Sequence, residues 1–248
     1  MKLKLILSGL ITLIALLLVG CGNNNGNTAM DVSVRGFQGI VEEHLAGILN
    51  AERAIAASVE AQSGDWDTVK PILAQFADDL STDAAVWYVF SDGHYYTVEK
   101  DLVDASLSDR DYFSSLMSGE DIEGDLVISK STGKRSIIVA TQVDGNTSVA
   151  IGVSVDAELL SQLVTERLQL PENMYFFALD QEFQTPIHSN IERIFAYPAE
   201  FDESLEGVFE SIQGNDQGVI TYTLNGDQIT ATYHASEILG WQFFIAEK

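Results

Sequence analysis

Residues 84–93 read AAVWYVFSDG, and this stretch sets the expectation for the fold. Residues 84–90 are rich in aromatic and β-branched side chains, which is typical of a strand, and Ser91-Asp92-Gly93 is a turn signal. Residues 95–98, YYTV, then have the composition of a returning strand. The stretch therefore predicts an antiparallel hairpin.

Segments typical of strands and turns continue to the end of the chain in two rounds. The first round has a polar helical stretch at 109–117, three further strands and a helix at 158–167. These strands are expected at 126–129, 136–143 and 148–155. The second round, after Pro171, has a helix at 204–212 and five strands, at 174–179, 185–188, 219–224, 228–234 and 241–246. Antiparallel strands with helices between them predict an α+β fold.

Two helices are expected before the first strand. Residues 34–61 predict one long helix, because apolar residues recur at a spacing of three to four. These residues are Val41, Leu45, Ile48, Ile55 and Val59. This apolar seam is able to pair with a second copy in a homodimer or to pack on the chain's own sheets, and Glu52 within it favours the second alternative. The next helix is expected to begin with Thr68 as its cap, since Pro71 is tolerated only in a first turn.

The N-terminus has the features of a bacterial lipoprotein precursor. Lys2 and Lys4 precede an apolar run at 5–19, which has the length of a signal-peptide core and is short for a transmembrane span. The run ends in Leu18-Val19-Gly20-Cys21, which matches the lipobox pattern of such precursors. We therefore expect residues 1–20 to be a signal peptide and Cys21 to carry lipid. The alternative is an ordinary N-terminal membrane anchor with an incidental cysteine.

The same region predicts where the protein resides. Residues 21–33 are expected to be a flexible tether, because the polar run GNNNGN at 22–27 directly follows the lipidated cysteine. Two acyl chains supply the paired signal that stable membrane anchoring requires. The expected location is the cell envelope, with the chain facing the periplasm or the exterior. Gly22 is not the aspartate of an inner-membrane retention signal, which favours the outer membrane in a cell that has two membranes.

Charge narrows the range of partners. The chain has 13 Lys and Arg against 37 Asp and Glu, a formal net charge of −24. So acidic a chain argues against nucleic acid, which needs basic side chains to displace its counterions. It argues equally against broad contact with an anionic lipid surface, so only the lipid on Cys21 is expected to touch the membrane.

The order of elements resembles the extracytoplasmic double-Cache (PAS-like) sensor domains of bacterial chemoreceptors, histidine kinases and diguanylate cyclases. Six segments carry the likeness: residues 87–93, 107–113 (LSDRDYF), 128–134, 151–156, 177–180 and 240–243. The resemblance implies N-terminal helices at 34–80, a membrane-distal module at 81–170 and a smaller proximal module at 171–248. It also implies a small-molecule ligand in the distal module. Because the chain stops at Lys248 without a transmembrane helix or a signalling domain, we expect it to signal through a separate membrane kinase, cyclase or chemoreceptor.

The resemblance also points to ligand-binding residues. In the amino-acid-binding members an Arg, a Trp, Tyr residues and an Asp surround the ligand. Arg110 matches that arginine, Tyr112 stands where the Trp would be, and Phe113 replaces a Tyr. Ser154 stands at the Asp position, with Asp156 two residues on and on the same strand face. An amino acid or another carboxylate is therefore the expected type of ligand.

Each candidate residue also has a purely structural interpretation. A guanidinium between aromatic rings is able to grip a carboxylate, but Arg110 is also able to pair with Asp109 or Asp111. Asp156 is suited to accept an ammonium group or to cap the helix that follows it. The remaining candidates are tyrosines that line a pocket or fill a core, and two small polar residues: Tyr88, Tyr96, Ser129 and Ser154.

The sequence gives little sign of catalysis. The four histidines are scattered without metal-ligand spacing, no nucleophile turn appears, and Cys21 is the only cysteine. We therefore expect neither an enzyme nor a cofactor or metal. The leading hypothesis is a lipid-anchored sensor that binds a small solute near Arg110. The alternative is an envelope interaction module whose Cache-like pocket is closed.

Overall fold

The computed structural model describes residues 25–248. The predicted signal peptide and Cys21 lie outside the described residues. Among residues 25–248, no helix combines the length and the apolar character that a membrane crossing would require.

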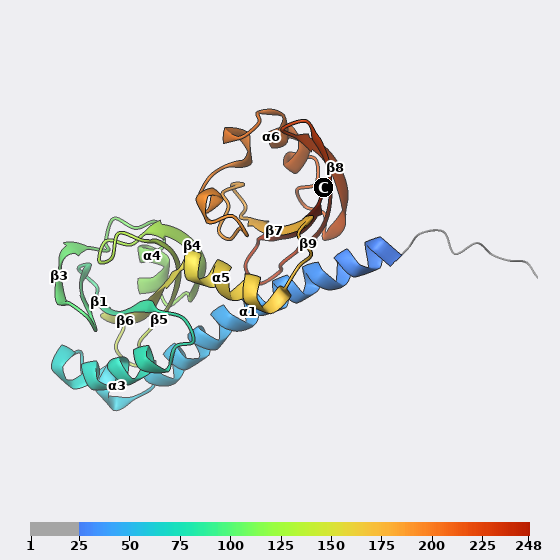
Figure 1. Ribbon diagram of the computed structural model, residues 1–248. Coiled ribbons are helices and arrows are strands. Elements are labelled where there is room, and N and C mark those ends of the chain that lie inside the picture. Colours follow the sequence, from blue (N-terminus) through green and yellow to red (C-terminus); the bar gives the residue numbers. More distant parts are fainter. Residues whose placement is uncertain (1–24) are drawn as a thin grey trace, which may run out of the picture.

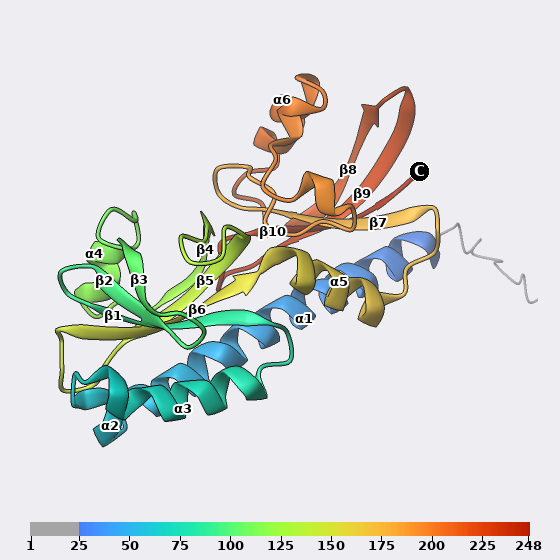
Figure 2. The ribbon, with the colours of Figure 1, turned by 60° about the vertical axis from the view of Figure 1, so that its left-hand side comes forward.

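A long helix, α1 (Asn25–Ala56), runs along the molecule and contacts strands of two separate sheets (Figures 1 and 2). The first sheet has the strand order β3-β2-β1-β6-β5-β4, and the second has the order β7-β10-β9-β8. Every pairing between these strands is antiparallel. The predicted α+β fold, a long helix followed by two antiparallel sheets, is confirmed.

The first sheet and its helices precede residue 170. Its strands are β1 (Ala84–Phe90), β2 (His94–Thr97), β3 (Asp101–Ser106), β4 (Ile122–Ile128), β5 (Arg135–Gln142) and β6 (Val149–Asp156). Its short helices are α2 (Val59–Gln62), α3 (Trp66–Asp79), α4 (Phe113–Met117) and α5 (Ala157–Leu168).

The second sheet follows. Its strands are β7 (Met174–Leu179), β8 (Gln217–Leu224), β9 (Asp227–Ala235) and β10 (Gln242–Glu247). Between β7 and β8 the chain forms two 3₁₀ turns and a helix: η1 (Ile191–Arg193), η2 (Pro198–Glu200) and α6 (Ser204–Glu210).

Both faces of the first sheet are covered. On one face, Val86, Tyr88 and Val153 belong to the core that the sheet shares with α1 and α3. On the other face, Trp87 and Val89 pack with residues of α4 and of the segment before it. We call these the helix face and the α4 face. Because neighbouring strand residues point to opposite faces, β1 supplies large side chains to both cores.

The start of α1 was predicted wrongly. The helix begins at Asn25 rather than at residue 34, so residues 25–33 are helical and not a tether. Met30 on this extension is buried, as is Val34 directly after it, in the core that α1 shares with the second sheet. Burial of these side chains stabilises a helix that the local sequence alone does not indicate.

The end of α1 also differs from the prediction. The helix stops at Ala56 instead of residue 61, and Ser58 caps the separate helix α2 by accepting the backbone N–H of Ala61 at 3.2 Å. Val59 is 75% exposed and does not belong to the seam. Val41 and Leu45 of the seam are buried against the chain's own sheets, so this part of it is not free for a second copy.

Helix α3 begins before the predicted cap. Asp65 is the cap, and its carboxylate accepts the backbone N–H of Thr68 at 3.0 Å. Pro71 therefore lies inside the helix, where its missing N–H removes one hydrogen bond. Trp66 at the start of α3 attaches the helix to the first sheet: its ring stacks on Tyr96 at 5.1 Å and its indole N–H donates to Asp101 at 3.0 Å.

Three smaller differences occur in the strands and loops. Residues 185–188 make a single bridge, between Phe177 and His188, instead of a full strand. Only Phe113–Met117 of the expected helix at 109–117 is helical. Strand β3 was not predicted, because its acidic, half-exposed sequence DLVDAS lacks the apolar alternation of a buried strand.

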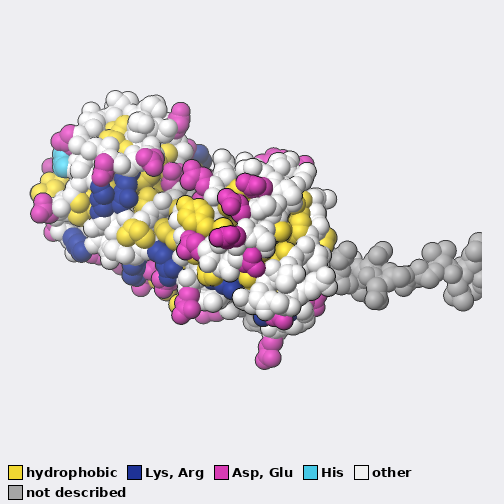
Figure 3. Space-filling model, turned by 90° about the horizontal axis from the view of Figure 1, so that it is seen from above, with side chains coloured by type: hydrophobic (Ala, Val, Ile, Leu, Met, Phe, Trp, Pro, Cys, Tyr) yellow, Lys and Arg dark blue, Asp and Glu magenta, His cyan; other side chains and the backbone are white. Residues whose placement is uncertain are grey.

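The surface agrees with the strongly acidic composition. Acidic side chains are spread over the face seen in Figure 3, whereas Lys and Arg form small groups between them. An isolated basic side chain is therefore notable wherever it lies next to a pocket.

Candidate functional site

The centre of the α4 face is occupied by Trp87. Its indole ring lies over Gly152 on the neighbouring strand, where a Cβ atom would come within 2.1 Å of the ring. The indole N–H donates to the hydroxyl of Ser154 at 3.2 Å. Only glycine at position 152 leaves room for this large side chain.

Substitution of Gly152 tests this packing. We expect Gly152→Ala to lower the free energy of unfolding by about 1–3 kcal/mol, because the new methyl group overpacks a rigid ring. Urea unfolding measures the effect. Gly207→Ala is the matched control, since no atom lies within 4 Å of a Cβ added there. Equal stability of the two variants would show that Trp87 is free to move away.

A cavity of about 440 Å³ opens at one end of the first sheet, where Ala85, Ser136 and Ser154 of the α4 face line it. Trp87 itself is outside the lining, although its indole N–H donates to Ser154. The cavity lies where the β2–β3 turn, the β4–β5 turn, the end of β6 and the end of α3 meet. Its charged and polar lining includes Asp78, Asp83, Glu99, Lys134, Ser154 and Asp156. Four carboxylates and one ammonium group give this cavity a negative balance.

Asp156 has the capping role weighed for it and also pairs with a lysine of the chain. Its carboxylate accepts the backbone N–H of Glu158 at 2.9 Å and so caps α5. Its other oxygen pairs with Lys134 Nζ at 2.8 Å on the wall of the cavity. The hydrogen bond to Asp156 raises the pKa of Lys134. Sequence reasoning did not select Lys134, although this residue ends the segment 128–134, and it missed Glu99 in the turn after β2.

The other predicted residues of the α4 face lie outside this cavity. The Arg110 guanidinium donates to the carbonyl of Ile128 at 2.5 Å and forms no ion pair with Asp109 or Asp111. Its Nε is buried and has no hydrogen-bond partner among the described residues. Tyr112 and Phe113 are buried beside α4, and burial raises the pKa of Tyr112.

A carboxylate near Tyr112 was also missed. Asp125 on β4 is paired with Ile138 on β5. Desolvation raises the pKa of Asp125, and the nearby carboxylate of Asp111 raises it further. A one-residue irregularity in β4 at Gly124 sets which side chains face α4, and the sequence pattern did not reveal it.

Ser129 is buried in the turn between β4 and β5. Its hydroxyl lies 3.2 Å from that of Ser131 and accepts the backbone N–H of Thr132 at 3.3 Å. These contacts hold the turn that carries Lys134 toward the cavity.

Tyr88 and Tyr96 lie on the helix face, across the sheet from Arg110. Tyr88 donates its hydroxyl to the carbonyl of Ala61 at 2.6 Å, and burial raises its pKa to about 12. Tyr96 stacks on Trp66. The structure therefore does not bring these two tyrosines together with the other candidates.

Metal-ligating side chains do not gather in the described part of the chain. No group of three His, Cys, Asp or Glu residues there is placed to hold a metal ion. The cavity on the α4 face thus offers charge and hydrogen bonding to a ligand.

Comparisons with known proteins place this fold. No protein-family model and no curated protein matches the chain. Solved structures do: the sensory domain of the Campylobacter jejuni chemoreceptor Tlp3 with isoleucine bound has 17% identity and a TM-score of 0.66, covering 90% of this chain and 93% of that one. The ligand-binding domain of the Pseudomonas aeruginosa chemoreceptor PctB with L-arginine has 12% identity and a TM-score of 0.68, covering 90% and 93%.

A third similar structure is the extracellular domain of the putative histidine kinase rpHK1S-Z16. It has 14% identity and a TM-score of 0.73, and the match covers 90% of this chain and 94% of that one. All three are sensory or extracellular receptor domains. The resemblance to extracytoplasmic sensor domains is therefore confirmed at the level of the fold.

Proposed function

We propose that this chain, which has the fold of extracytoplasmic receptor domains, binds a small amine-bearing solute such as an amino acid in the cavity of its first module. The observation that carries the proposal is that cavity, where the Asp156–Lys134 pair faces further carboxylates. The similar structures of Tlp3 and PctB support the choice, because they contain isoleucine and L-arginine.

The charges of the lining suggest how such a ligand would lie. Carboxylates of Glu99 and Asp156 suit an ammonium group, since a charged donor and a charged acceptor make the stronger hydrogen bonds. Lys134, 55% exposed at its side chain, is free to turn toward the ligand's carboxylate. A zwitterionic ligand would then break the Asp156–Lys134 ion pair, with its ammonium group on Asp156 and its carboxylate on Lys134. Its side chain would rest on Ala85 and Val98.

Calorimetric titration of the purified protein with isoleucine, valine and arginine tests the proposal. We expect binding by at least one of them, no binding of its N-acetyl derivative, and affinity at least about tenfold lower in Lys134→Gln. Lys248→Gln, which removes a lysine paired with Asp227 in the second module, is the matched control and should bind normally.

Arg110 provides a second position for the same function. Its buried, unpartnered Nε suits a carboxylate acceptor if the side chains around it open. Loss of amino-acid binding in Arg110→Gln, with normal binding in Lys134→Gln, would move the site to Arg110.

The proposal includes a lipid anchor at Cys21 in the cell envelope and a separate membrane protein as the signalling partner. Cells that express the protein and are fed labelled palmitate should incorporate the label into it, and Cys21→Ala should abolish incorporation. Labelling of Cys21→Ala at the level of the unchanged protein would contradict the anchor.

Trp87 favours a second candidate function, an interaction module with a closed pocket. Its ring fills the centre of the α4 face and leaves Arg110 outside the cavity. Absence of binding across all amino acids, with the protein folded, would favour this function over the solute sensor.

A further inference from the structure

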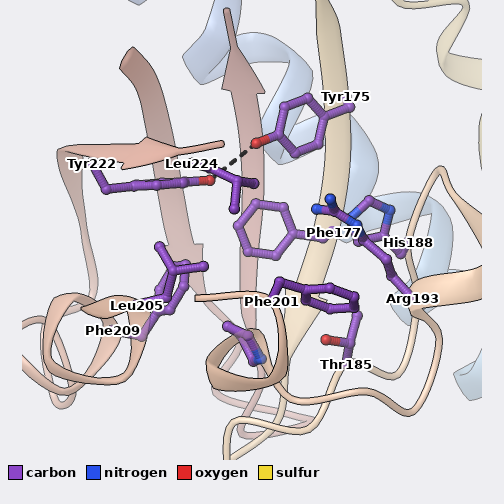
Figure 4. A pocket seen from close by; sticks show the side chains of 11 residues that line it. Tyr175, Phe177, Thr185, His188, Arg193, Phe201, Leu205, Phe209, Tyr222 and Leu224 are labelled. Carbon is purple, nitrogen blue, oxygen red and sulfur yellow. Dashed lines mark hydrogen bonds between the residues drawn. The ribbon is translucent and has the colours of Figure 1, made fainter. Parts of the chain in front are cut away.

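The second module contains a pocket of its own, at the base of the loop that joins β7 to α6. Figure 4 shows its aromatic lining, with Tyr175, Phe177, Phe201 and Phe209 among the labelled side chains. The Phe177 ring also stacks on Phe244 in the core, with 4.5 Å between the ring centres, and this contact fixes one wall of the pocket. This pocket belongs to the second sheet, so it is separate from the cavity on the α4 face.

A single cation lies in this lining. Arg193, at the end of η1, places its guanidinium 4.6 Å from the centre of the Phe201 ring. Among residues 25–248 the guanidinium has no hydrogen bond or ion pair. Arg35, Arg53 and Arg135, by contrast, each pair with an acidic side chain.

The pocket contains no acidic residue, although the chain as a whole has 37. An unpaired arginine among aromatic rings, without a carboxylate beside it, creates a local positive potential. Burial lowers the pKa of His188 and raises the pKa of Tyr175. The charge of Arg193 is a smaller effect, which adds to the lowering at His188 and reduces the rise at Tyr175. The charge of Arg193 thus acts on the space that these side chains enclose.

His188 adds a hydrogen-bond donor. Its Nδ1 accepts the backbone N–H of Asn190 at 2.8 Å, so the neutral ring carries its proton on Nε2. Burial, followed by the charge of Arg193, lowers the pKa of His188 to about 3, which keeps the ring neutral at physiological pH. In the described chain the Nε2–H has no hydrogen-bond acceptor. The ring of Tyr175 stacks on that of His188 at 5.9 Å, and its hydroxyl lies 3.1 Å from the hydroxyl of Tyr222 (Figure 4).

We propose that this pocket of the second module binds a small carboxylate, with its oxygens on Arg193 and His188 Nε2–H and its apolar body between the rings of Phe177 and Phe201. Arginine binds carboxylates through two parallel hydrogen bonds, and a neutral imidazole N–H is able to add a third. The aromatic rings would exclude water from the ligand's carbon atoms.

The dimensions of the pocket limit the size of the ligand. The space between the side chains is about 350 Å³ when the open mouth is included, and the centres of water molecules fit into only about 30 Å³ of it. A carboxylate of roughly two to four carbons is therefore the expected ligand. Phe201 is 41% exposed and belongs to the mouth, so it would move as the ligand enters.

Propionate is the probe that tests this proposal, with propionamide as its uncharged control. Titration of the purified protein, followed by calorimetry and by the ¹⁵N resonances of the His188 ring, should show binding of propionate and none of propionamide. Arg193→Gln should weaken binding at least about tenfold, and Arg193→Lys should weaken it less. Arg167→Gln, which removes an exposed arginine of α5, is the matched control.

The outcomes separate this site from the one in the first module. Lys134→Gln should bind propionate normally, since it alters only the cavity on the α4 face. Equal binding of propionate and propionamide would overturn the proposal, as would unchanged affinity in a folded Arg193→Gln or a His188 resonance that does not respond. Failure of amino acids to bind the first module would leave these results unaffected.

Discussion

Replacement of Phe37 by alanine is expected to lower the free energy of unfolding by about 3–5 kcal/mol, one of the largest effects of any single substitution in this chain. Phe37 lies on α1 and is fully buried. Its ring centre is 4.9 Å from those of Phe176 on β7 and Phe243 on β10. The substitution removes both aromatic contacts and leaves a cavity between α1 and the second sheet.

Guanidinium unfolding followed by circular dichroism measures this effect. Val32→Ala is the matched control: Val32 is also on α1 but is 64% exposed, and its loss should change stability by no more than about 0.5 kcal/mol. In Phe37→Ala we also expect the second module to unfold at lower denaturant than the first, because α1 joins them. A loss below about 1 kcal/mol would show that the second module does not depend on this contact.

The elements of the fold were largely predictable because their signals are local. The hairpin of β1 and β2 follows from a strand composition around a Ser-Asp-Gly turn, and the α5 cap follows from Asp156 at the end of an apolar strand. These features depend on residues close together in the chain, so tertiary contacts had little to add.

The faces of the first sheet were not predictable in the same way. Every residue from Ala85 to Val89 is buried, since helices cover one side of β1 and α4 covers the other. Alternation identifies a face only where one side of a strand is polar. Tyr88 was therefore grouped with Arg110, although Tyr88 lies on the helix face and Trp87 is the β1 residue at the centre of the α4 face.

The cavities depend on contacts between distant segments. Lys134 and Glu99 line the same cavity because the β4–β5 and β2–β3 turns lie at the same end of the sheet. Arg193 meets His188 because the chain folds back after a single bridge to β7. Neither pair is marked by a sequence motif that contains both of its residues, and only the pairing of strands brings them together.

Glu52 carries the other large expected effect, because it is a buried acid without a partner. The side chain is fully buried on α1, and neither carboxylate oxygen has a hydrogen bond among the described residues. Burial raises its pKa well above the usual range, and the nearby carboxylates of Asp121 and Glu123 raise it further. Arg53, the next residue, does not neutralise Glu52, since its guanidinium pairs with Asp121 at 2.6 Å.

The raised pKa determines how stability depends on pH. Above a pH of about 4.5, the usual pKa of Glu, the unfolded chain loses this proton while the folded chain keeps it. The folded state then binds more protons than the unfolded state, so stability must fall as the pH rises. The fall ends once the pH passes the pKa of Glu52 in the folded protein.

Glu52→Leu is therefore expected to stabilise the protein by about 2–4 kcal/mol at pH 8 and by less at pH 5. Urea unfolding at the two pH values measures both differences, and Glu43→Leu, an exposed position on the same helix, should change stability little at either. A gap between Glu52→Leu and the unchanged protein that stays constant from pH 5 to pH 8 would contradict the raised pKa. A destabilised Glu52→Leu at pH 8 would show that α1 needs a polar group at this point, facing Asp121 and Glu123.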